Sequence, residues 1–503
     1  MEELRQALKD YLDLGRPGWT YSMLEGKVAE LAQEDQDSSR LVQRVMENPN
    51  YFYPILEEML PQFDMLTKHV FANYAIQKAF EVAALASDVA EQRRKDPQAV
   101  LKGTGFSAPL TAAVVEVWVK DDPLEKMMQC VRGKVVEYSQ HMYGCRAMQR
   151  ALESMPEKDF DEALNEFRGK AAASVLDANA NHVVQKMIEL HPEKCQFMLE
   201  EFLADLVNLS CHAHGCRLLQ RVFEISAKRG ELEVRPLLEE VIRRLNELSI
   251  HQYGNYVVQH GLANAPADIK HRFIGLLIPQ LYAFSCSKFA SNVAERAVSC
   301  ADEEERNSML EEFKKSFGDA TSGNYLILMM ADIYANYVIQ RFIDNASPDQ
   351  RDALVEIVRP HLRLVSNSEY GRHLLRKMES MSLLSKEALH QCGVYDTNHT
   401  VSIANGHKSQ SNGKNHNNNN NNRRGNTAAP NRGGRQNQPN HPQHHNNNAA
   451  RYQNPMAPPH KSNSRYNTRS MEPQPYPYPY PMMYPPQPPM VYPMPMYNGY
   501  YPQ

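Results

Sequence analysis

A five-residue pattern recurs eight times between residues 39 and 340, and its spacing constrains the fold more than any other feature of the chain. Positions one and five of each copy are polar, whereas positions three and four are apolar. The copies span residues 39–43, 73–77, 145–149, 181–185, 216–220, 255–259, 291–295 and 336–340, with a degenerate ninth copy at 372–376. Their fifth positions lie 34 to 45 residues apart, except for one step of 72 residues between the second and third copies. Repeats of this length stack into a solenoid, in which each repeat contacts only its neighbours.

The segments between the copies have the periodicity of amphipathic helices. Apolar residues fall at i, i+3 and i+4 in LEEFLADLVNLS, residues 199–210, and in VRPLLEEVIRRLNELS, residues 234–249. On a helix, positions one and five of the pattern share a face, while positions three and four point to the packed side. The pattern therefore predicts an all-α solenoid over about residues 20 to 395. Within the long step, an insert near residues 86–122 lacks the pattern and contains a strand-like stretch, TAAVVEVWVK.

Stacked repeats would arrange the polar and planar residues of the pattern in rows. Positions one and five form the pairs Ser39/Gln43, Asn73/Gln77, Cys145/Gln149, Asn181/Gln185, Cys216/Gln220, Asn255/Gln259, Ser291/Glu295 and Asn336/Gln340. Position two is a side chain able to stack in seven copies, and the eight residues are Arg40, Tyr74, Arg146, His182, Arg217, Tyr256, Asn292 and Tyr337. The next residue after the pattern, position six, is Arg44, Lys78, Arg150, Lys186, Arg221, His260, Arg296 or Arg341.

A row of polar pairs, a row of stacking planes and a basic stripe together suit single-stranded RNA, whose bases stack on flat side chains and present their edges to be read. The net charge of the body, about residues 1–396, is −13, because it holds 45 basic and 58 acidic residues. A local basic stripe can outweigh this total, since salt screens distant charges beyond about 8–10 Å. The alternative is that the polar pairs only satisfy hydrogen bonds between repeats and that the cations form a solvated face.

The segment from residue 396 to 503 has a different composition. It contains an asparagine run at 417–422 and glycine-arginine patches, and then becomes rich in proline, tyrosine and methionine. From residue 397 onward ten basic residues stand against one acid, a net charge of +9. Such a segment has too little aliphatic surface to fold, so it is predicted to be a disordered tail. It would add weak RNA affinity or direct the protein into granules, or else act only as a solubilising spacer.

Other classes of protein find little support in the sequence. No run of about 18 apolar residues predicts a membrane span, and the acidic N-terminus is unlike a secretory signal. Eight scattered cysteines without a CxxC pair suit a reducing compartment, cytoplasm or nucleus. No familiar catalytic motif occurs, so the chain is not expected to be an enzyme or to bind a cofactor. Cys211, His212, His214 and Cys216 could suggest a metal site, but their spacing is unlike that of zinc modules and Cys216 occupies position one.

With motifs such as NYVIQ, NYVVQ, CRLLQ, NHVVQ and SNVAE, in contexts such as MYGCR and QYGNY, the chain resembles the Pumilio (PUF) family of RNA-binding proteins over about residues 20 to 395. The resemblance implies a right-handed crescent of eight three-helix repeats, with the pattern on the second helix and facing the concave side. It implies one base read per repeat and RNA bound antiparallel. It divides the chain into an N-terminal cap at 1–20, a Pumilio homology domain at 21–395 and the tail at 396–503.

The family's base code assigns a target to the pairs. Glu295 with Ser291 is expected to select guanine, because a carboxylate accepts from both donors on the guanine edge. Asn/Gln pairs are expected to read uracil, and Cys/Gln or Ser/Gln pairs adenine, by the family code more than by geometry. Read from the eighth repeat to the first, the site is 5′-UGUAUAUA-3′.

The resemblance also implies a regulatory role and partners. The expected targets are 3′ untranslated regions of messenger RNA, and the expected outcome is repression or decay. A deadenylase complex and corepressors would dock on the convex face and on the loop before the eighth repeat. The protein is expected to be cytoplasmic and monomeric on RNA. Two rivals remain: a protein-binding scaffold of the HEAT or armadillo type, and the nucleolar branch of PUF-like proteins.

Overall fold

The structure is a computed structural model that describes residues 1–16, 18–97, 105–316 and 323–395. These residues belong to the first compact unit of the chain, Met1–Asn405, whereas the second unit, Gly406–Gln503, lies wholly outside them. The predicted tail at 396–503 and most of the loop before the eighth repeat, at 317–322, also fall outside the described residues.

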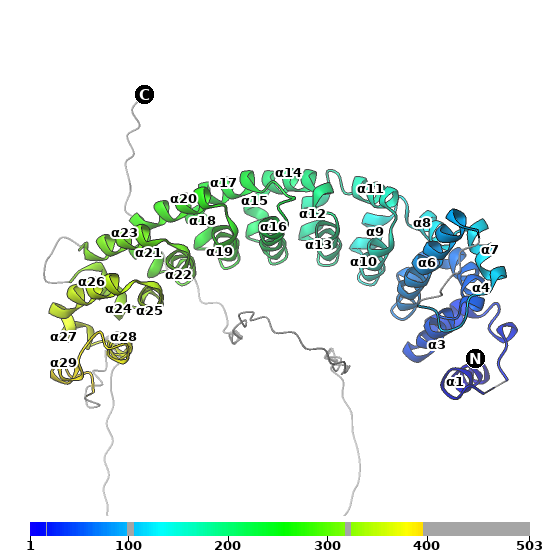
Figure 1. Cartoon of the computed structure of the whole chain (residues 1–503), viewed down its shortest axis with the longest axis horizontal. Coiled ribbons are helices and arrows are strands. Elements are labelled where there is room, and N and C mark those ends of the chain that lie inside the picture. Colours follow the sequence, from blue (N-terminus) through cyan, green and yellow to red (C-terminus); the bar gives the residue numbers. More distant parts are fainter. Residues whose placement is uncertain (17, 98–104, 317–322, 396–503) are drawn as a thin grey trace, which may run out of the picture. The chain divides into compact units, whose positions relative to one another are not determined.

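Every copy of the pattern lies on a helix, and each of these motif helices packs against the next one along the chain. The motif helices are α3 (Gln36–Met46), α6 (Ala72–Lys95), α10 (Gly144–Ser154), α13 (Ala180–Leu190), α16 (Gly215–Arg229), α19 (Gly254–Asn264), α22 (Ala290–Cys300), α25 (Ala335–Asn345) and α28 (Glu369–Ser380). In the first unit they form the inner edge of a curved row (Figure 1).

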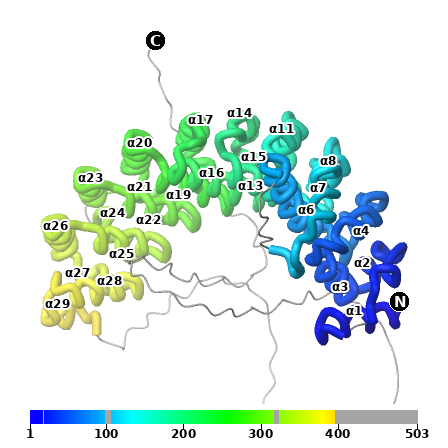
Figure 2. Tube along the Cα trace, turned by 45° about the vertical axis from the view of Figure 1, so that its right-hand side comes forward, coloured from blue at the N-terminus to red at the C-terminus, as the bar shows by residue number. Residues whose placement is uncertain are grey.

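A second set of helices lines the outer edge of the same row (Figures 1 and 2). It comprises α4 (Pro49–Met59), α8 (Pro123–Val131), α11 (Glu157–Glu166), α14 (Gln196–Ala204), α17 (Arg235–Arg243), α20 (Ala267–Leu277), α23 (Glu303–Lys314) and α26 (Pro348–Val358). Their starts follow ordinary capping rules: Asp302 and Glu305 form a reciprocal capping box at α23, and proline opens α4, α8 and α26. Helix α2 (Val28–Glu34) is the short helix that precedes α3 and packs on it.

Short helices connect the two rows. They are α5 (Phe63–Thr67), α9 (Val135–Gln140), α12 (Ala171–Leu176), α15 (Leu206–Ser210), α18 (Leu245–Ser249), α21 (Leu281–Ser285), α24 (Tyr325–Ala331) and α27 (Leu362–Val365). The remaining helices are α1 (Glu2–Leu14), α7 (Ala112–Lys120) and α29 (Lys386–Gln391), with 3-10 turns at Tyr21–Met23, Leu60–Gln62, Pro192–Lys194, Ile278–Gln280 and Arg359–His361. The predicted all-α solenoid is confirmed. Of the described helices, none could cross a membrane alone, and only the bent pair α24 and α25 meets the length and composition test.

The core runs between the two rows as one continuous apolar cluster. Positions three and four of each motif helix are buried in it; Val257 and Val258, for example, are fully buried. Phe273 and Leu277 of the outer helix α20 are also fully buried in the cluster. Because burial of apolar surface is the main stabilising term, these inward positions fix how the motif helices turn and hence which side chains reach the inner surface.

Two described parts of the insert near 86–122, up to Lys95 and from Ala112 to Lys120, are helical, which corrects the strand-like reading of TAAVVEVWVK. Residues Ala112–Lys120 form α7, and α6 continues through the first part of the insert to Lys95. Trp118 of α7 is fully buried and stacks on Phe106, with ring centroids 5.3 Å apart. Helix α7 packs along α6, while α6 and α10 still contact each other directly. The burial of one side of α7 makes it amphipathic, and its β-branched residues imitate a strand only in composition.

Candidate nucleic-acid interface

The eight copies of the pattern expose the same positions. Position one is buried, position two is exposed, positions three and four are buried and position five is partly buried in every copy. The tyrosines at position two are 44 to 57% exposed, unusually open for aromatic side chains. Adjacent motif helices therefore present a row of planar side chains beside a row of partly covered polar ones. This is the arrangement that the sequence predicted, although the assignment of these residues to RNA binding stays a prediction.

Positions one and five are hydrogen-bonded within their own helix. The position-five amide nitrogen donates to the position-one side chain in the pairs Gln43–Ser39 at 3.2 Å, Gln77–Asn73 at 2.9 Å, Gln259–Asn255 at 2.9 Å and Gln340–Asn336 at 3.0 Å. In the cysteine copies the glutamine instead donates to the position-one backbone carbonyl, from Gln149 and Gln220. Gln185 differs, because it donates to Glu189 at 3.1 Å. Most of the pairs are thus pre-oriented within one helix; two members also bond between repeats, since Ser39 donates to the carbonyl of Phe71 at 2.9 Å and Glu295 accepts from Arg341.

An asparagine at position one is largely committed to the fold. The Asn255 amide nitrogen donates to the carbonyls of His251 at 2.8 Å and Gln252 at 3.0 Å, while its Oδ1 accepts from Gln259. Both amide hydrogens of this buried side chain are therefore satisfied inside the protein. The hydrogen-bonding groups left for an incoming base belong mainly to the glutamine at position five.

The cysteines at position one are neutral and separate from any metal-like cluster. Burial raises the pKa of the Cys145 and Cys216 thiols. The Cys216 thiol donates to the carbonyl of Ala213 at 3.5 Å, and Nδ1 of His212 accepts from the His214 N–H. Two of the four residues that could have suggested a metal site, His212 and Cys216, are thus engaged with backbone groups.

Sequence reasoning missed the residue four places before position one, which caps the motif helix. It is Asp35, His69, His141, Asp177, His212, His251 or Asp332 in seven of the eight copies. Nδ1 of His251 accepts from the N–H groups of Tyr253 and Gly254, and Oδ1 of Asp332 accepts from those of Tyr334 and Ala335. The regular His/Asp at this offset was a readable signal, because capping needs an acceptor there.

The basic position six is not an open cationic stripe. In most repeats its cation pairs with a carboxylate at position nine, four residues after position five, of the preceding motif helix. These pairs are Lys78–Glu47 at 3.1 Å, Arg150–Glu81 at 3.1 Å, Lys186–Glu153 at 2.5 Å, Arg221–Glu189 at 2.7 Å, His260–Glu224 at 3.3 Å and, in the ninth copy, Lys377–Asp344 at 2.6 Å. We call this series the ion-pair ladder. It corrects the expected basic stripe, because an acid lies beside the position-six side chain in most of the repeats.

The ion-pair ladder has a carboxylate partner from α1 at its N-terminal end, and it lacks the position-nine carboxylate in the sixth and seventh repeats. Arg44 pairs with Asp13 of α1 at 2.6 Å, so α1 supplies the acid that a preceding repeat would provide. Position nine is Ala263 in the sixth repeat and Ser299 in the seventh. Within the described residues, Arg296 accordingly has no carboxylate at ion-pair distance. Arg341 pairs with Glu295, a position-five residue.

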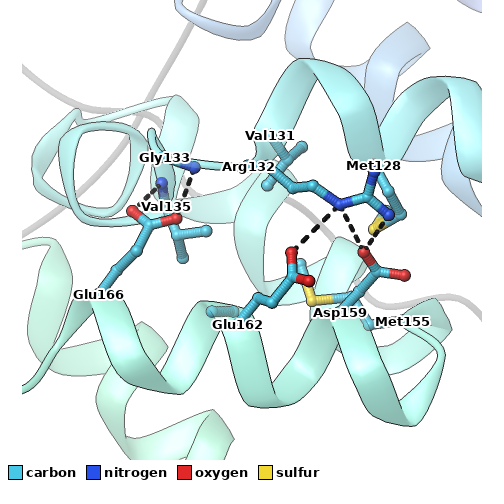
Figure 3. A pocket seen from close by; sticks show the side chains of 10 residues that line it. Met128, Val131, Arg132, Gly133, Val135, Met155, Asp159, Glu162 and Glu166 are labelled. Atoms are coloured by element: carbon cyan, nitrogen blue, oxygen red, sulfur yellow. Dashed lines mark hydrogen bonds and ion pairs between the residues drawn. The ribbon is translucent and has the colours of Figure 1, made fainter.

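A pocket on α8, α9 and α11 is unrelated to the pattern (Figure 3). Arg132 enters it and bonds Asp159, while the carboxylate of Glu166 accepts from the N–H groups of Gly133 and Val135 at 2.8 Å. Glu201 caps the next repeat in the same way, accepting from Gly169 and Ala171. The polar groups that line the pocket are thus engaged in holding neighbouring helices together.

The fold and this inner surface define a helical-repeat solenoid with one polar pair and one exposed planar side chain per repeat. Seven segments match the model of the Pumilio-family RNA binding repeat: residues 62–85, 134–167, 176–203, 205–229, 244–278, 280–313 and 325–358. They contain copies two to eight of the pattern; the first copy lies outside them on a helix that packs in the same way. The chain belongs to the Pumilio family, which is one of RNA-binding proteins and not of enzymes.

Curated relatives agree with this assignment. A Pumilio domain-containing protein of Schizosaccharomyces pombe is 28% identical over 358 residues, covering 70% of this chain and 46% of the relative. Pumilio homolog 12 of Arabidopsis thaliana is 24% identical over 361 residues, covering 71% of this chain and 53% of the relative. The chain therefore spans about half the length of these relatives.

Solved structures match the described fold. PUF-8 in complex with PBE-RNA is 25% identical with a TM-score of 0.59, covering 73% of this chain and 96% of PUF-8. The Puf3 RNA binding domain bound to a Cox17 RNA 3′ UTR site is 24% identical with a TM-score of 0.53, covering 76% of this chain and 98% of that domain. The second likeness concerns the fold alone.

Proposed function

We propose that the protein binds single-stranded RNA sequence-specifically along its motif helices, with the element 5′-UGUAUAUA-3′ as the preferred site. The observation that carries the proposal is the eightfold repetition of an exposed position-two side chain next to a pre-oriented polar pair. Flat side chains spaced in this way stack between successive bases, and polar groups beside them face the base edges. The matches to RNA-bound PUF structures support the same function.

The base assignments follow from the position-five chemistry and the family code. Glu295 in the seventh repeat brings the sole carboxylate among the eight position-five residues, and guanine is the base with two adjacent donors on its edge. The glutamines at the other positions offer both donor and acceptor groups, which suits uracil or adenine. The partner at position one, asparagine or a small side chain, distinguishes between these two.

We further propose that the RNA elements lie in 3′ untranslated regions and that binding represses translation or hastens decay. The partners would be a deadenylase complex and corepressors, with the protein monomeric on RNA and located in the cytoplasm, including RNA granules. Deleting residues 397–503 tests the contribution of the tail. Unchanged granule localisation and RNA affinity would rule out that contribution.

Fluorescence anisotropy with the full-length chain tests RNA recognition at fixed, near-physiological salt. The probes are UGUAUAUA and ACAAUAUA. We expect the changed bases to weaken binding at least tenfold, since each mismatch costs about 1–3 kcal/mol in comparable nucleic-acid interfaces. Equal binding to both probes would mean that the bases are not read. Binding to neither would favour a protein-binding scaffold.

A specificity swap tests the register of repeats on bases. The double variant Ser291→Asn with Glu295→Gln gives the seventh repeat the pair found in the sixth and eighth. We expect the preferred second base to change from guanine to uracil, with about 1–3 kcal/mol of discrimination reversed. Anisotropy with UGUAUAUA and UUUAUAUA measures the change. A retained preference for guanine would show that the seventh repeat reads another position.

A further inference from the structure

The ion-pair ladder changes partner at one place, between α22 and α25. On the C-terminal side Lys377 takes the position-nine carboxylate of Asp344, and on the N-terminal side the last such pair is His260 with Glu224, because Arg296 of the seventh repeat has no carboxylate at ion-pair distance within the described residues. In the seventh repeat, position nine is Ser299, whose hydroxyl donates to the backbone carbonyl of Glu295 at 3.0 Å. Arg341, the cation of the eighth repeat, therefore meets no carboxylate at the usual place on α22.

Arg341 instead binds the side chain of Glu295. Its Nε and Nη2 donate to Glu295 Oε1 at 3.0 and 2.5 Å. The Glu295 side chain is 30% exposed and that of Arg341 is 44% exposed, so the pair lies at the surface of the groove and not in the core. Both contacts end on Oε1, and among the described residues no hydrogen bond is made to Oε2.

We propose that Arg341 is a positioning residue for guanine recognition, holding the Glu295 carboxylate oriented while a base covers it. This inference rests on the proposed function, because it needs Glu295 to read a base. It goes further in assigning the selectivity of the seventh repeat to a residue of the eighth repeat, outside the five-residue pattern.

Two physical effects lead to this assignment. A base that stacks over the groove excludes water from Glu295, and a carboxylate that loses water without a charged partner becomes costly to keep ionised. A guanidinium fixed at one oxygen offsets this cost and holds the carboxylate plane. A carboxylate that turned away would no longer meet both donors on the guanine edge, so guanine would lose its advantage.

Arg341→Gln tests the proposal in the full-length chain, using anisotropy with UGUAUAUA and UAUAUAUA, which differ at the second base. At pH 7.5 we expect the variant to bind the guanine probe about tenfold more weakly and to lose most of its preference over adenine; the effect is kept modest because the pair is partly exposed. Arg341→Lys, which keeps the charge, should restore much of the selectivity.

Two more variants separate positioning from general stabilisation. Lys186→Gln removes a ladder cation that pairs with Glu153, in a repeat whose position five is glutamine, so it should leave the guanine preference unchanged. Ser299→Glu supplies the missing position-nine carboxylate and should draw Arg341 from Glu295, lowering the preference without removing any cation. This second variant tests the proposal even if Arg341→Gln folds poorly.

The outcomes are distinct. A wild-type chain without preference between the two probes overturns the proposed function and this inference together. A wild-type preference that Arg341→Gln and Ser299→Glu both leave intact overturns the role of Arg341 alone. A preference that increases in Arg341→Gln would show that the arginine competes with the base, which also contradicts the proposal.

Discussion

The contact between α6 and α10 and the contact between α16 and α19 join equivalent repeats through very different lengths of chain. Their fifth positions are 72 residues apart in the first case and 39 in the second. Both pairs of helices nevertheless pack directly. Each is also joined by one pair of the ion-pair ladder, Arg150–Glu81 at 3.1 Å and His260–Glu224 at 3.3 Å. The distance between motif helices is thus independent of the chain that connects them.

The extra chain is accommodated differently at the two contacts. Before α10, the insert lengthens α6 and adds α7, which contributes Trp118 to the core. Before α19, α16 continues to Arg229 and ends at Gly230, whose φ of 69° is the left-handed conformation that terminates helices. In both cases the addition follows position nine of the motif helix, so the polar pair and the stacking residue keep their places.

Trp118→Ala should have the largest effect on stability, and it should disturb only the packing of the insert beside α6 and α10. Removing a fully buried indole that stacks on Phe106 leaves a cavity, so we expect a loss of about 3–5 kcal/mol in the free energy of unfolding. Urea denaturation measures the loss. The matched control is Val117→Ala on the same helix, which is 42% exposed and should cost less than about 0.5 kcal/mol. Equal losses in the two variants would mean that α7 does not pack on α6 as described.

Gly215→Ala should have the next largest effect, at the start of α16. A Cβ at this glycine would lie 2.2 Å from the carbonyl oxygen of Leu209, closer than atoms can approach. The backbone must shift, and we expect about 1–3 kcal/mol of destabilisation. Gly275→Ala on the outer helix α20 meets nothing within 4 Å and should instead stabilise by about 0.5–1 kcal/mol. A neutral Gly215→Ala would show that α15 and α16 approach less closely.

The repeats were readable from the sequence because each needs the same inward residues. Positions three and four had to be apolar to reach the core, so the motif helices and their exposed faces followed from the pattern. The caps at His251 and Asp332 were also encoded at a constant offset, but a histidine in a sequence does not reveal whether its ring accepts from a backbone N–H.

Two features, the ion-pair ladder and helix α7, could not be predicted from the sequence, because they depend on residues that are distant along the chain but close in space. The partner of a position-six cation lies on another helix about one repeat away, so the ladder could not be deduced from a single copy. A row of cations therefore looked like a phosphate-binding stripe until the acids were placed beside it. Residues 111–120 were misread for a related reason: valines in α7 suit a strand by local preference, and packing against α6 decides the outcome.

His260→Gln should have the smallest effect, and it tests the one rung of the second region that can titrate. Burial lowers the pKa of His260 more than the nearby Glu224 raises it, so the folded protein favours the neutral ring. The unfolded chain then binds more protons near its ordinary pKa of about 6.5, and this histidine's contribution is lost as the pH falls from about 7 toward the lower folded pKa. Between pH 7.5 and 5, the variant should therefore lose less stability than the wild type, by under about 1 kcal/mol. Urea midpoints at the two pH values measure the difference.

His271→Gln is the control of opposite sign, because a hydrogen bond to Glu305 raises the pKa of His271, and the contribution of His271 to stability is lost as the pH rises. An equal pH response of His260→Gln and wild type would mean that the pair of His260 and Glu224 stays open to water.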